Sequence, residues 1–362
     1  MVLTFGEIMM RIAPEGNLRF RQAMPGKVDV TFAGGEANVC ASLAIFGAKT
    51  RYLTALPDNA ITQCLLSVLK GLGIDTDCVL FRKQGRLGIY FLETGANQRS
   101  SNVLYDRDAS AISLAAPGEY DFDKALEGVR WVHVTGITPS LSENAYLSTL
   151  ELARRARAAK ATVSCDLNFR KKLWNWRPGR SSKQLANECM SQILPSVDLV
   201  IGNEEDAADV LGITAEGTSV EEGRINARAY ETVARAIVAR FPNVSRVAIT
   251  LRESISADHN NWGGMLFDVA SDRAHFAPLD AGGEYRSYEI RDIVDRVGGG
   301  DSFGAGLIHA LNSPDYGDPA MAIRFAVAAS CLKHSIKDDF NYVTRDEVVA
   351  LVAGQASGRV RR

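Results

Sequence analysis

The sequence predicts an α/β protein with a mostly parallel central sheet, helices on both of its faces, and a small antiparallel β lid. Three observations predict this fold. Short β-branched runs alternate with helical patterns along nearly the whole chain, which is typical of right-handed crossovers between parallel strands. Two polar-alternating stretches without an intervening helix interrupt this alternation. With 362 residues, 46% of them hydrophobic and 23% charged, the chain can bury a large core.

The elements of the main sheet follow from the residue pattern. A strand is expected where β-branched residues run together, and a helix where apolar residues recur with helical spacing. The runs 131–136 and 162–167 both end in small or polar residues, and ligands of open parallel sheets gather at such carboxyl ends. In chain order, the pattern predicts strand 2–8, helix 36–46, strand 50–54, strand 131–136, helix 142–159, strand 162–167, strand 199–202, helix 226–240, strand 247–251, helix 301–311 and helix 318–333.

The two interrupting stretches, 17–33 and 86–107, are predicted to form the lid. A lid strand with exposed polar groups leaves an unpaired edge, and pairing two lids across a two-fold axis removes it, so we expect a homodimer through the lid. An acidic, glycine-bearing exposed loop is predicted at 213–226. The remaining assignments are a main nucleotide- and substrate-binding domain at 1–16, 34–85 and 108–353, and a flexible tail at 354–362.

Composition excludes several classes of protein. A net charge of −2 gives no global attraction to nucleic acid or to an anionic membrane, and no apolar run approaches the roughly 20 residues that span a bilayer. The first residues lack the basic region of a signal peptide, so we expect a cytoplasmic protein. The six cysteines show no Cys-x-x-Cys spacing, and no His-Glu-x-x-His occurs, which argues against a zinc site or a disulfide scaffold.

Three glycines run into Asp301, which opens an apolar helical pattern. Without side chains at Gly298, Gly299 and Gly300, main-chain N–H groups can converge at the positive end of a helix dipole and hold an anion. A carboxylate beside them can accept a proton from a hydroxyl while charge builds on a nearby phosphoryl group. The alternative is a structural turn with an aspartate N-cap.

A second glycine pair, Gly34 and Gly35, precedes a predicted helix that ends at Gly47. The two glycines allow a ligand to approach the main chain closely, and Asn38, one turn later, can hydrogen-bond sugar hydroxyls. A plain junction between a loop and a helix is the alternative.

Tyr105 and Arg107 project from one face of a predicted lid strand, and Tyr90 on the neighbouring strand can join that face. A phenol beside a guanidinium suits a polyhydroxy ligand with a carboxylate, because arginine binds a carboxylate through two parallel hydrogen bonds. The alternative is a lid surface with an ordinary salt bridge.

Polar residues also follow two strands of the main sheet. Asn168 and Arg170 come after 162–167 and are expected at the ligand-gathering edge, although an exposed arginine is commonly just solvated. Asn203 and Asp206 follow 199–202 and share a helical face, so an amide and a carboxylate can hold a hydrated Mg²⁺ between phosphates. Helix capping explains the same acidic composition.

Together these residues resemble the ribokinase-like (PfkB-type) carbohydrate kinases, over essentially the whole chain. Two motifs carry the resemblance: Gly34-Gly35 with Asn38, and Asp295-x-x-Gly-x-Gly-Asp301. It implies a ribokinase-like three-layer α/β/α domain with a β lid. Asp301 is then the base that deprotonates the substrate hydroxyl, and Gly298 to Gly300 form the anion hole.

Within the family, the chain resembles the 2-keto-3-deoxygluconate kinases through Tyr90, Tyr105, Arg107 and the Arg170 segment, which continues into Leu-Trp. The implied reaction phosphorylates the 6-hydroxyl of that sugar acid with ATP. Asp295 is expected to position a substrate hydroxyl or a nearby monovalent cation such as K⁺. The resemblance implies a sugar-acid site at Gly34, Gly35, Asn38, Tyr90, Tyr105, Arg107, Arg170, Asp295 and Asp339.

ATP and Mg²⁺ are the implied cofactors. Asn203 and Asp206 match the family's Asn-x-x-Glu metal-phosphate motif with a carboxylate one methylene shorter, which favours metal contact through water. A second departure is the segment 250–264, where about ten residues replace a short glycine-containing turn. The implied nucleotide contacts are Asn168, Asn203, Thr250, Arg252, Gly298 and Gly300.

Other functions stay open at this point. A fructokinase or ribokinase of the same family binds a neutral sugar, which the paired arginines disfavour. A non-catalytic sugar-sensing relative is compatible with the altered 250–264 segment but not with an intact Asp301. A nucleotide-dependent dehydrogenase is disfavoured because no Gly-x-Gly-x-x-Gly follows the first strand.

Overall fold

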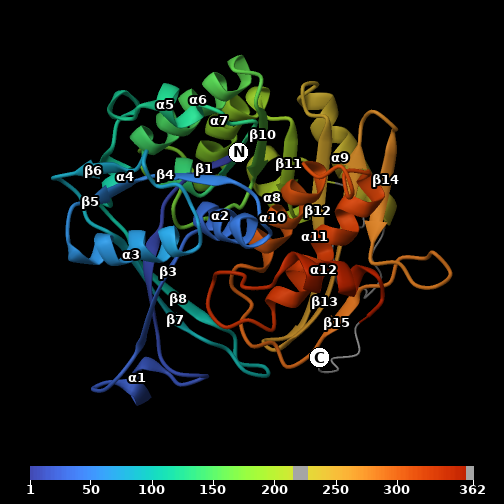
Figure 1. Cartoon of the computed structure of the whole chain (residues 1–362), viewed down its shortest axis with the longest axis horizontal. Coiled ribbons are helices and arrows are strands. Elements are labelled where there is room, and N and C mark those ends of the chain that lie inside the picture. Colours follow the sequence, from blue (N-terminus) through green and yellow to red (C-terminus); the bar gives the residue numbers. More distant parts are fainter. Residues whose placement is uncertain (215–226, 356–362) are drawn as a thin grey trace.

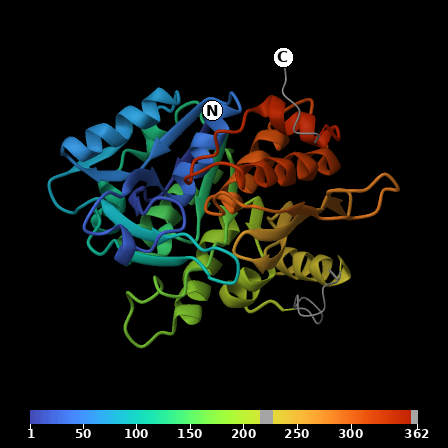
Figure 2. The same cartoon turned by 90° about the horizontal axis from the view of Figure 1, so that it is seen from below.

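The computed structural model describes residues 1–214 and 227–355 and has three layers: a central sheet with helices on each face (Figures 1 and 2). The nine-stranded sheet has the order β14-β13-β12-β11-β10-β9-β1-β4, and β15 pairs with β13. Its strands are β1 (Val2–Phe5), β4 (Thr50–Leu53), β9 (Trp131–Thr135), β10 (Thr162–Asp166), β11 (Leu199–Gly202), β12 (Arg246–Ser256), β13 (His259–Asp268), β14 (Arg273–Ala277) and β15 (Tyr288–Ile290).

The strands from β4 to β12 pair in parallel, as the alternation of strands and helices predicts. Strands β1, β9 and β11 are buried at every position, because helices cover both faces of the sheet. Antiparallel β13, β14 and β15 extend one edge. The parallel strands end together at one edge of the sheet, where polar residues follow β10 and β11.

Two sets of helices cover the two faces (Figure 1). Helices α6, α7 and α9 pack with the strands in the largest apolar cluster, and α2, α10 and α11 pack on the opposite face. The helices of the main body are α2 (Gly35–Ile45), α3 (Ala60–Gly71), α4 (Ala111–Leu114), α5 (Phe122–Leu126), α6 (Glu143–Ala158), α7 (Ser182–Ile193), α8 (Glu204–Asp206), α9 (Ala227–Arg240), α10 (Gly299–Leu311), α11 (Pro319–Lys333) and α12 (Arg345–Val352).

The lid is a separate four-stranded sheet with the order β3-β2-β7-β8, which projects from the body in Figure 1. Two antiparallel pairs are joined by parallel pairing of β2 with β7. Its elements are β2 (Met9–Ala13), α1 (Phe20–Ala23), β3 (Asp29–Ala33), β7 (Gly88–Glu93) and β8 (Asn102–Asp106), and a two-stranded sheet of β5 (Ala55–Pro57) and β6 (Leu80–Arg82) lies in the body.

Two strand predictions need correction. The strand expected at 2–8 ends at Phe5, and the chain then forms β2 in the lid sheet rather than continuing in the body. The stretch 17–28 is not a strand, because it contains α1 and a proline-glycine turn. Alternating polarity does not distinguish a lid strand from a surface loop, which explains both errors.

The unusual segment after Thr250 is a long β-hairpin. Strand 247–251 is the first part of β12, which runs on to Ser256 and returns as β13 after a two-residue turn. The hairpin tip meets the lid, since the Ala257 N–H donates to the Asn97 carbonyl over 2.8 Å. The extra residues of the hairpin therefore form a contact between the body and the lid.

Two further predictions fall mostly on residues that the structure does not describe. They are the acidic loop at 213–226 and the tail at 354–362. In each segment, the structure describes only the first two residues. No helix in the described ranges 1–214 and 227–355 is long and apolar enough to cross a membrane.

Candidate active site

A cavity of about 1340 Å³ lies between the lid, the carboxyl ends of β9 to β12 and the start of α10. All the predicted site residues except Asp295 line it. They are Gly34, Gly35, Asn38, Tyr90, Tyr105, Arg107, Asn168, Arg170, Asn203, Asp206, Thr250, Arg252, Gly298, Gly299, Gly300, Asp301 and Asp339. The parallel sheet thus brings together residues that are up to about 300 positions apart in the chain, as the rule for ligand sites in open sheets predicts.

Asp301 lies in the first turn of α10, immediately after the glycines. Gly298 caps the helix with a positive φ of 80°, and a Cβ there would lie 2.4 Å from the Asp339 carbonyl oxygen, so only glycine fits. The first intrahelical bond joins the Ser302 N–H to the Gly298 carbonyl. The N–H groups of residues 299 to 301 precede it and have no acceptor within the helix, an arrangement that suits an anion.

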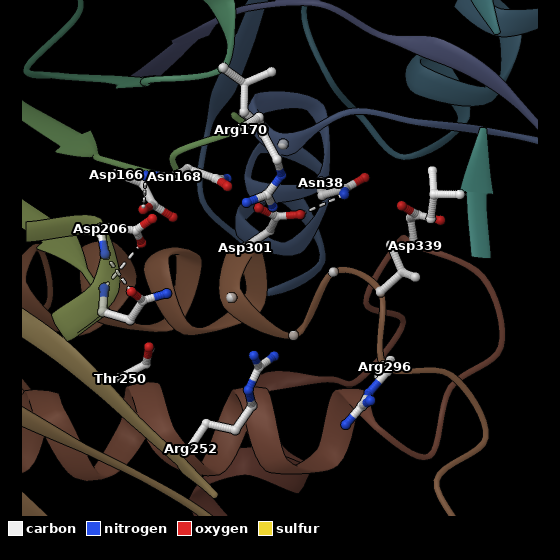
Figure 3. A pocket seen from close by; sticks show the side chains of 18 of the residues that line it. Asn38, Asp166, Asn168, Arg170, Asp206, Thr250, Arg252, Arg296, Asp301 and Asp339 are labelled. Atoms are coloured by element: carbon white, nitrogen blue, oxygen red, sulfur yellow. Dashed lines mark hydrogen bonds between the residues drawn. The ribbon is translucent and has the colours of Figure 1, made fainter. Parts of the chain in front are cut away.

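The Asp301 carboxylate is held from the opposite helix. Asn38 in α2 donates its side-chain amide to Asp301 Oδ2 over 2.7 Å (Figure 3). Burial raises the pKa of Asp301 to about 6, although the Asn38 hydrogen bond lowers it; Asp339 raises it further. Figure 3 shows the Arg170 side chain pointing toward this carboxylate from the other side of the cavity. Asp301 is therefore a carboxylate held in place by Asn38, with a pKa closer to neutral than is usual for an aspartate.

The Gly34 turn places α2 against the start of the lid. A Cβ at Gly34 would lie 2.1 Å from the Glu7 carbonyl oxygen, so this junction requires glycine. The Gly34 N–H donates to Asn38 Oδ1 over 3.3 Å, which leaves the Asn38 amide nitrogen directed at Asp301. Asn38, the expected sugar ligand, therefore uses its side-chain amide for Asp301 in this structure.

The lid supplies the aromatic and cationic face that its strand pattern predicts. Tyr90 in β7 pairs across the sheet with Tyr105 in β8, and their ring centroids are 6.3 Å apart. The Arg107 guanidinium lies 5.3 Å from the centre of the Tyr105 ring. Arg107 is buried and forms an ion pair with Glu7, so its charge is already partly balanced.

Asp295 was predicted to position a substrate hydroxyl or a nearby monovalent cation, and it alone among the predicted site residues does not line the cavity. In the described structure it lies behind the cavity wall, and Arg11 lies between it and Asp339. Arg11 donates to Asp295 Oδ2 and to Asp339 Oδ1, each over 2.6 Å. Tyr90 donates to the same Asp339 oxygen over 2.7 Å. Asp295 therefore fixes Arg11, and Asp339 is the carboxylate that faces the cavity.

Asp166 and Asp206 line the cavity near the ends of β10 and β11, together with Glu205. Burial raises the pKa of Asp166, and the neighbouring Asp206 and Asp301 raise it further. Asp206 accepts from the main-chain N–H groups of Phe169, over 2.9 Å, and Asn203, over 3.2 Å. Oxygen ligands of this kind suit Mg²⁺, and a cation would relieve their mutual repulsion. Since Asp206 and Asn203 are already hydrogen-bonded, contact through water fits best.

Arginines line the opposite side of the cavity. Arg252 comes from β12 and Arg296 from the loop before α10, and both line the cavity. In Figure 3 the Arg252 side chain points toward the start of α10, whereas Arg296 points away from Asp301 and donates to Asn260 Oδ1 over 2.5 Å. Burial lowers the pKa of Arg296, and Arg252 lowers it further. Two such cations repel each other, and a multiply charged anion between them would relieve this repulsion.

Sequence reasoning missed several residues that shape the cavity. Asp166 is the last residue of β10, two positions before the predicted Asn168, so its place at the carboxyl end of a strand could have indicated a site residue. Arg296 lies inside the glycine motif but at a position without a pattern of its own. Glu7 and Arg11 gave no signal, because a single charged residue in a strand is ordinary. Glu36, buried behind Gly35, accepts from Thr135 and Thr138, and burial raises its pKa to about 7.

The comparisons with known proteins settle the family. Residues 1–240 match the model of the pfkB family carbohydrate kinases. The chain belongs to this family. It is a carbohydrate kinase, which sets aside the sensing and dehydrogenase alternatives.

Three relatives show which members of the family the chain is similar to. The chain is 41% identical to a 2-dehydro-3-deoxygluconokinase from Thermotoga maritima, with 98% of this chain and 99% of that one covered and a TM-score of 0.87. It is 28% identical to a 2-dehydro-3-deoxygalactonokinase from Haloferax volcanii over 99% of this chain and 98% of that protein. A fructokinase from Xylella fastidiosa, solved with bound ATP, shares the fold at a TM-score of 0.73 and 18% identity, covering 98% and 99% of the two chains.

Replacing Asp301 with asparagine tests the base. We expect Asp301→Asn to lower kcat by roughly 10²- to 10⁴-fold, because the substrate proton loses its acceptor. Sugar binding, measured by calorimetry, and the melting temperature should stay close to those of the parent protein, since asparagine fills the same space. An unchanged kcat would exclude Asp301 as the base.

The pKa of Asp301 predicts the acid limb of the pH profile. Because this pKa is raised to about 6, the carboxylate is charged above that pH and protonated below it. We therefore expect kcat/KM to fall tenfold per pH unit below about pH 6, since this ratio reports groups of the free enzyme. A profile that stays flat down to about pH 4.5, near the ordinary carboxyl range, would contradict this environment for Asp301.

Proposed function

We propose that the protein transfers the γ-phosphoryl group of ATP to the 6-hydroxyl of 2-keto-3-deoxygluconate. The observation that carries this proposal is the position of Asp301, which faces the cavity beside the main-chain N–H groups at the start of α10, with Arg170 pointing toward it. The likeness to the Thermotoga maritima 2-dehydro-3-deoxygluconokinase supports the same substrate.

The chemistry follows from the arrangement of α10. The Asp301 carboxylate accepts the proton of the 6-hydroxyl as its oxygen bonds to the γ-phosphorus. The bond between that phosphorus and the bridging oxygen breaks, and ADP leaves with the electron pair. The N–H groups after Gly298 stabilise charge on the transferred group, which is the main contribution a protein makes to phosphoryl transfer.

ATP and Mg²⁺ fit the two charged sides of the cavity. Arg252 and Arg296 would meet the phosphates, with Thr250, Asn168 and the Gly298 to Gly300 turn beside them. Asn203 and Asp206 would hold Mg²⁺ through water, and Asp166 adds the nearby carboxylate that sequence reasoning missed. When bound, Mg²⁺ neutralises charge on the phosphate oxygens. The ATP-bound fructokinase of the same fold supports this use of ATP.

Selection of an acid substrate rests on two arginines that line the cavity, Arg107 at the end of lid strand β8 and Arg170 after β10. Arg170 is exposed at the cavity edge, and its Nη1 donates to its neighbour's carbonyl over 3.0 Å, so its other donors are available to a carboxylate. Arg107 is paired with Glu7 and contributes less net charge than an isolated arginine. Tyr105 and Gly35 would border the sugar, with Asp339 and Tyr90 at its far end.

A second candidate substrate is the C4 epimer, 2-keto-3-deoxygalactonate. The observation that favours it is the 28% identical relative from Haloferax volcanii, which is named for that activity and matches over nearly the full length of both chains. Both acids carry the same carboxylate and the same 6-hydroxyl, so the reaction at Asp301 is common to them. A neutral ketose, as in a fructokinase, leaves Arg170 without a partner.

The proposed setting is a cytoplasmic homodimer. ATP is abundant in that compartment, and all six cysteines are free thiols, which suits a reducing environment. The lid sheet ends in two unpaired edges, β3 and β8, with Val30 and Leu104 exposed on them. Pairing of two lids would cover these apolar side chains and satisfy the edge.

A coupled ADP-release assay with ATP and Mg²⁺ tests the substrate. We expect turnover of 2-keto-3-deoxygluconate, of its C4 epimer, or of both, and little with fructose or ribose. Arg170→Ala should raise KM for the sugar acid by roughly 10- to 100-fold, because one charge-assisted hydrogen bond is lost. Its effect on a neutral sugar should be small.

The neighbouring Lys171 provides the matched control. It is exposed, carries the same charge and does not line the cavity, so Lys171→Ala should leave KM unchanged. An equal loss for fructose and for the sugar acid in Arg170→Ala would exclude carboxylate recognition. Arg107→Ala is a poorer probe, because it would leave Glu7 buried and unpaired.

Light scattering at micromolar concentration tests the dimer. We expect a mass of about twice the 39.3 kDa of one chain, and Leu104→Asp should shift it toward a single chain, since a carboxylate cannot be buried in the lid contact. A monomeric parent protein would contradict the lid dimer.

A further inference from the structure

A buried lysine, Lys333, has no part in the chemistry described above. It is the last residue of α11, and its relative exposure is 0%. Its ammonium donates to the carbonyl oxygen of Ile336 over 3.1 Å. Burial lowers the pKa of this ammonium, whereas the nearby Asp295 and Asp339 raise it. A fully buried charge is costly unless other charges compensate it, so its position calls for a role.

Lys333 lies directly behind the anion hole. Its Cε atom would lie 3.3 Å from a Cβ placed on Gly298, so the side chain runs against the turn that caps α10. Lys333 does not line the cavity, whereas Gly298, Gly299 and Gly300 do. Its charge also acts on Asp301, whose pKa it lowers. The ammonium thus reinforces the positive end of the α10 dipole from the protein side.

The same region is where the family resemblance places a monovalent cation, and the residues present do not fit one. Both oxygens of Asp295 are engaged: Oδ1 accepts from the Val297 N–H over 3.0 Å, and Oδ2 from Arg11 and from the Asp338 N–H. The guanidinium of Arg11 and the ammonium of Lys333 already supply two positive charges to this region. A free cation would be repelled by both.

We propose that the ammonium of Lys333 is a built-in monovalent cation that positions and polarises the anion hole, so that the enzyme needs no K⁺. The proposal rests on phosphoryl transfer at Asp301 as described above. Lys333 does not touch the substrate; it acts through the Gly298 turn and through the charge state of Asp301. A cation fixed by the chain is present at every turnover and does not depend on the ionic composition of the solution.

The parent protein gives the first test. With the sodium, potassium or tetramethylammonium salt as the only monovalent cation, kcat should be the same. Its melting temperature should likewise show no rise specific to K⁺, because a ligand that binds the folded state raises that temperature and none is expected to bind. Activation or stabilisation of the parent protein by K⁺ would overturn the proposal.

Two substitutions at Lys333 give the second test. Lys333→Met keeps much of the side-chain volume and removes the charge, so kcat should fall by about 10- to 100-fold with little change in KM for the sugar. The acid limb of its pH profile should also move to higher pH, because a charge that lowers the pKa of Asp301 is gone. A merely structural role would leave that limb in place.

Lys333→Ala opens space for a free cation. K⁺ or NH₄⁺ should restore part of its kcat and raise its melting temperature, whereas tetramethylammonium should do neither. Lys337→Met is the matched control, because Lys337 is exposed on the loop that follows α11 and pairs with Asp29 on the lid. It should keep the parent kcat.

The outcomes separate this proposal from the choice of substrate. A Lys333→Met variant with the parent kcat and pH profile would overturn the role of Lys333, whichever sugar is used. If neither variant folds, the comparison of sodium, potassium and tetramethylammonium salts on the parent protein still tests whether the enzyme needs K⁺. A parent protein that does not act on the sugar acid would contradict the proposed substrate, while the melting-temperature comparison would still test the cation.

Discussion

The site depends on two close approaches between main chains that only glycine permits. Gly34 lies against the Glu7 carbonyl, and Gly298 lies against the Asp339 carbonyl. These contacts set the starts of α2 and α10 side by side, so that Asn38 reaches Asp301 over 2.7 Å. A Cβ at Gly34 would collide with Glu7 and one at Gly298 with Asp339, so either substitution would displace the start of a helix that carries Asn38 or Asp301. The chemistry thus depends on backbone packing before any catalytic side chain is considered.

Once the helices are in place, buried charge determines the properties of the base. Asp295, Asp301 and Asp339 gather around the start of α10, balanced by the buried cations Arg11 and Lys333. Burial and Asp339 raise the pKa of Asp301 toward neutrality, whereas Asn38 and Lys333 lower it. A carboxylate in this balance is basic enough to accept a hydroxyl proton and still ionised near neutral pH.

The sequence was sufficient for the sheet and for most of the cavity lining, because alternating strands and helices force the carboxyl ends of β9 to β12 to one edge. It was insufficient wherever a role depends on pairing between distant residues. Asp295 stands in the central motif but serves Arg11, and Arg107 is committed to Glu7. The hairpin after Thr250 was visible as an insertion, yet its contact with the lid depends on tertiary packing.

A crystal structure with 2-keto-3-deoxygluconate and a non-hydrolysable ATP analogue is the most direct measurement. We expect the 6-hydroxyl within hydrogen-bonding distance of the Asp301 carboxylate, roughly 2.6–3.2 Å, with the γ-phosphate against the N–H groups after Gly298. The sugar carboxylate should lie beside Arg170. A sugar bound in the reverse direction, with its carboxylate at Asp301 and its 6-hydroxyl in the lid, would contradict the proposed reaction.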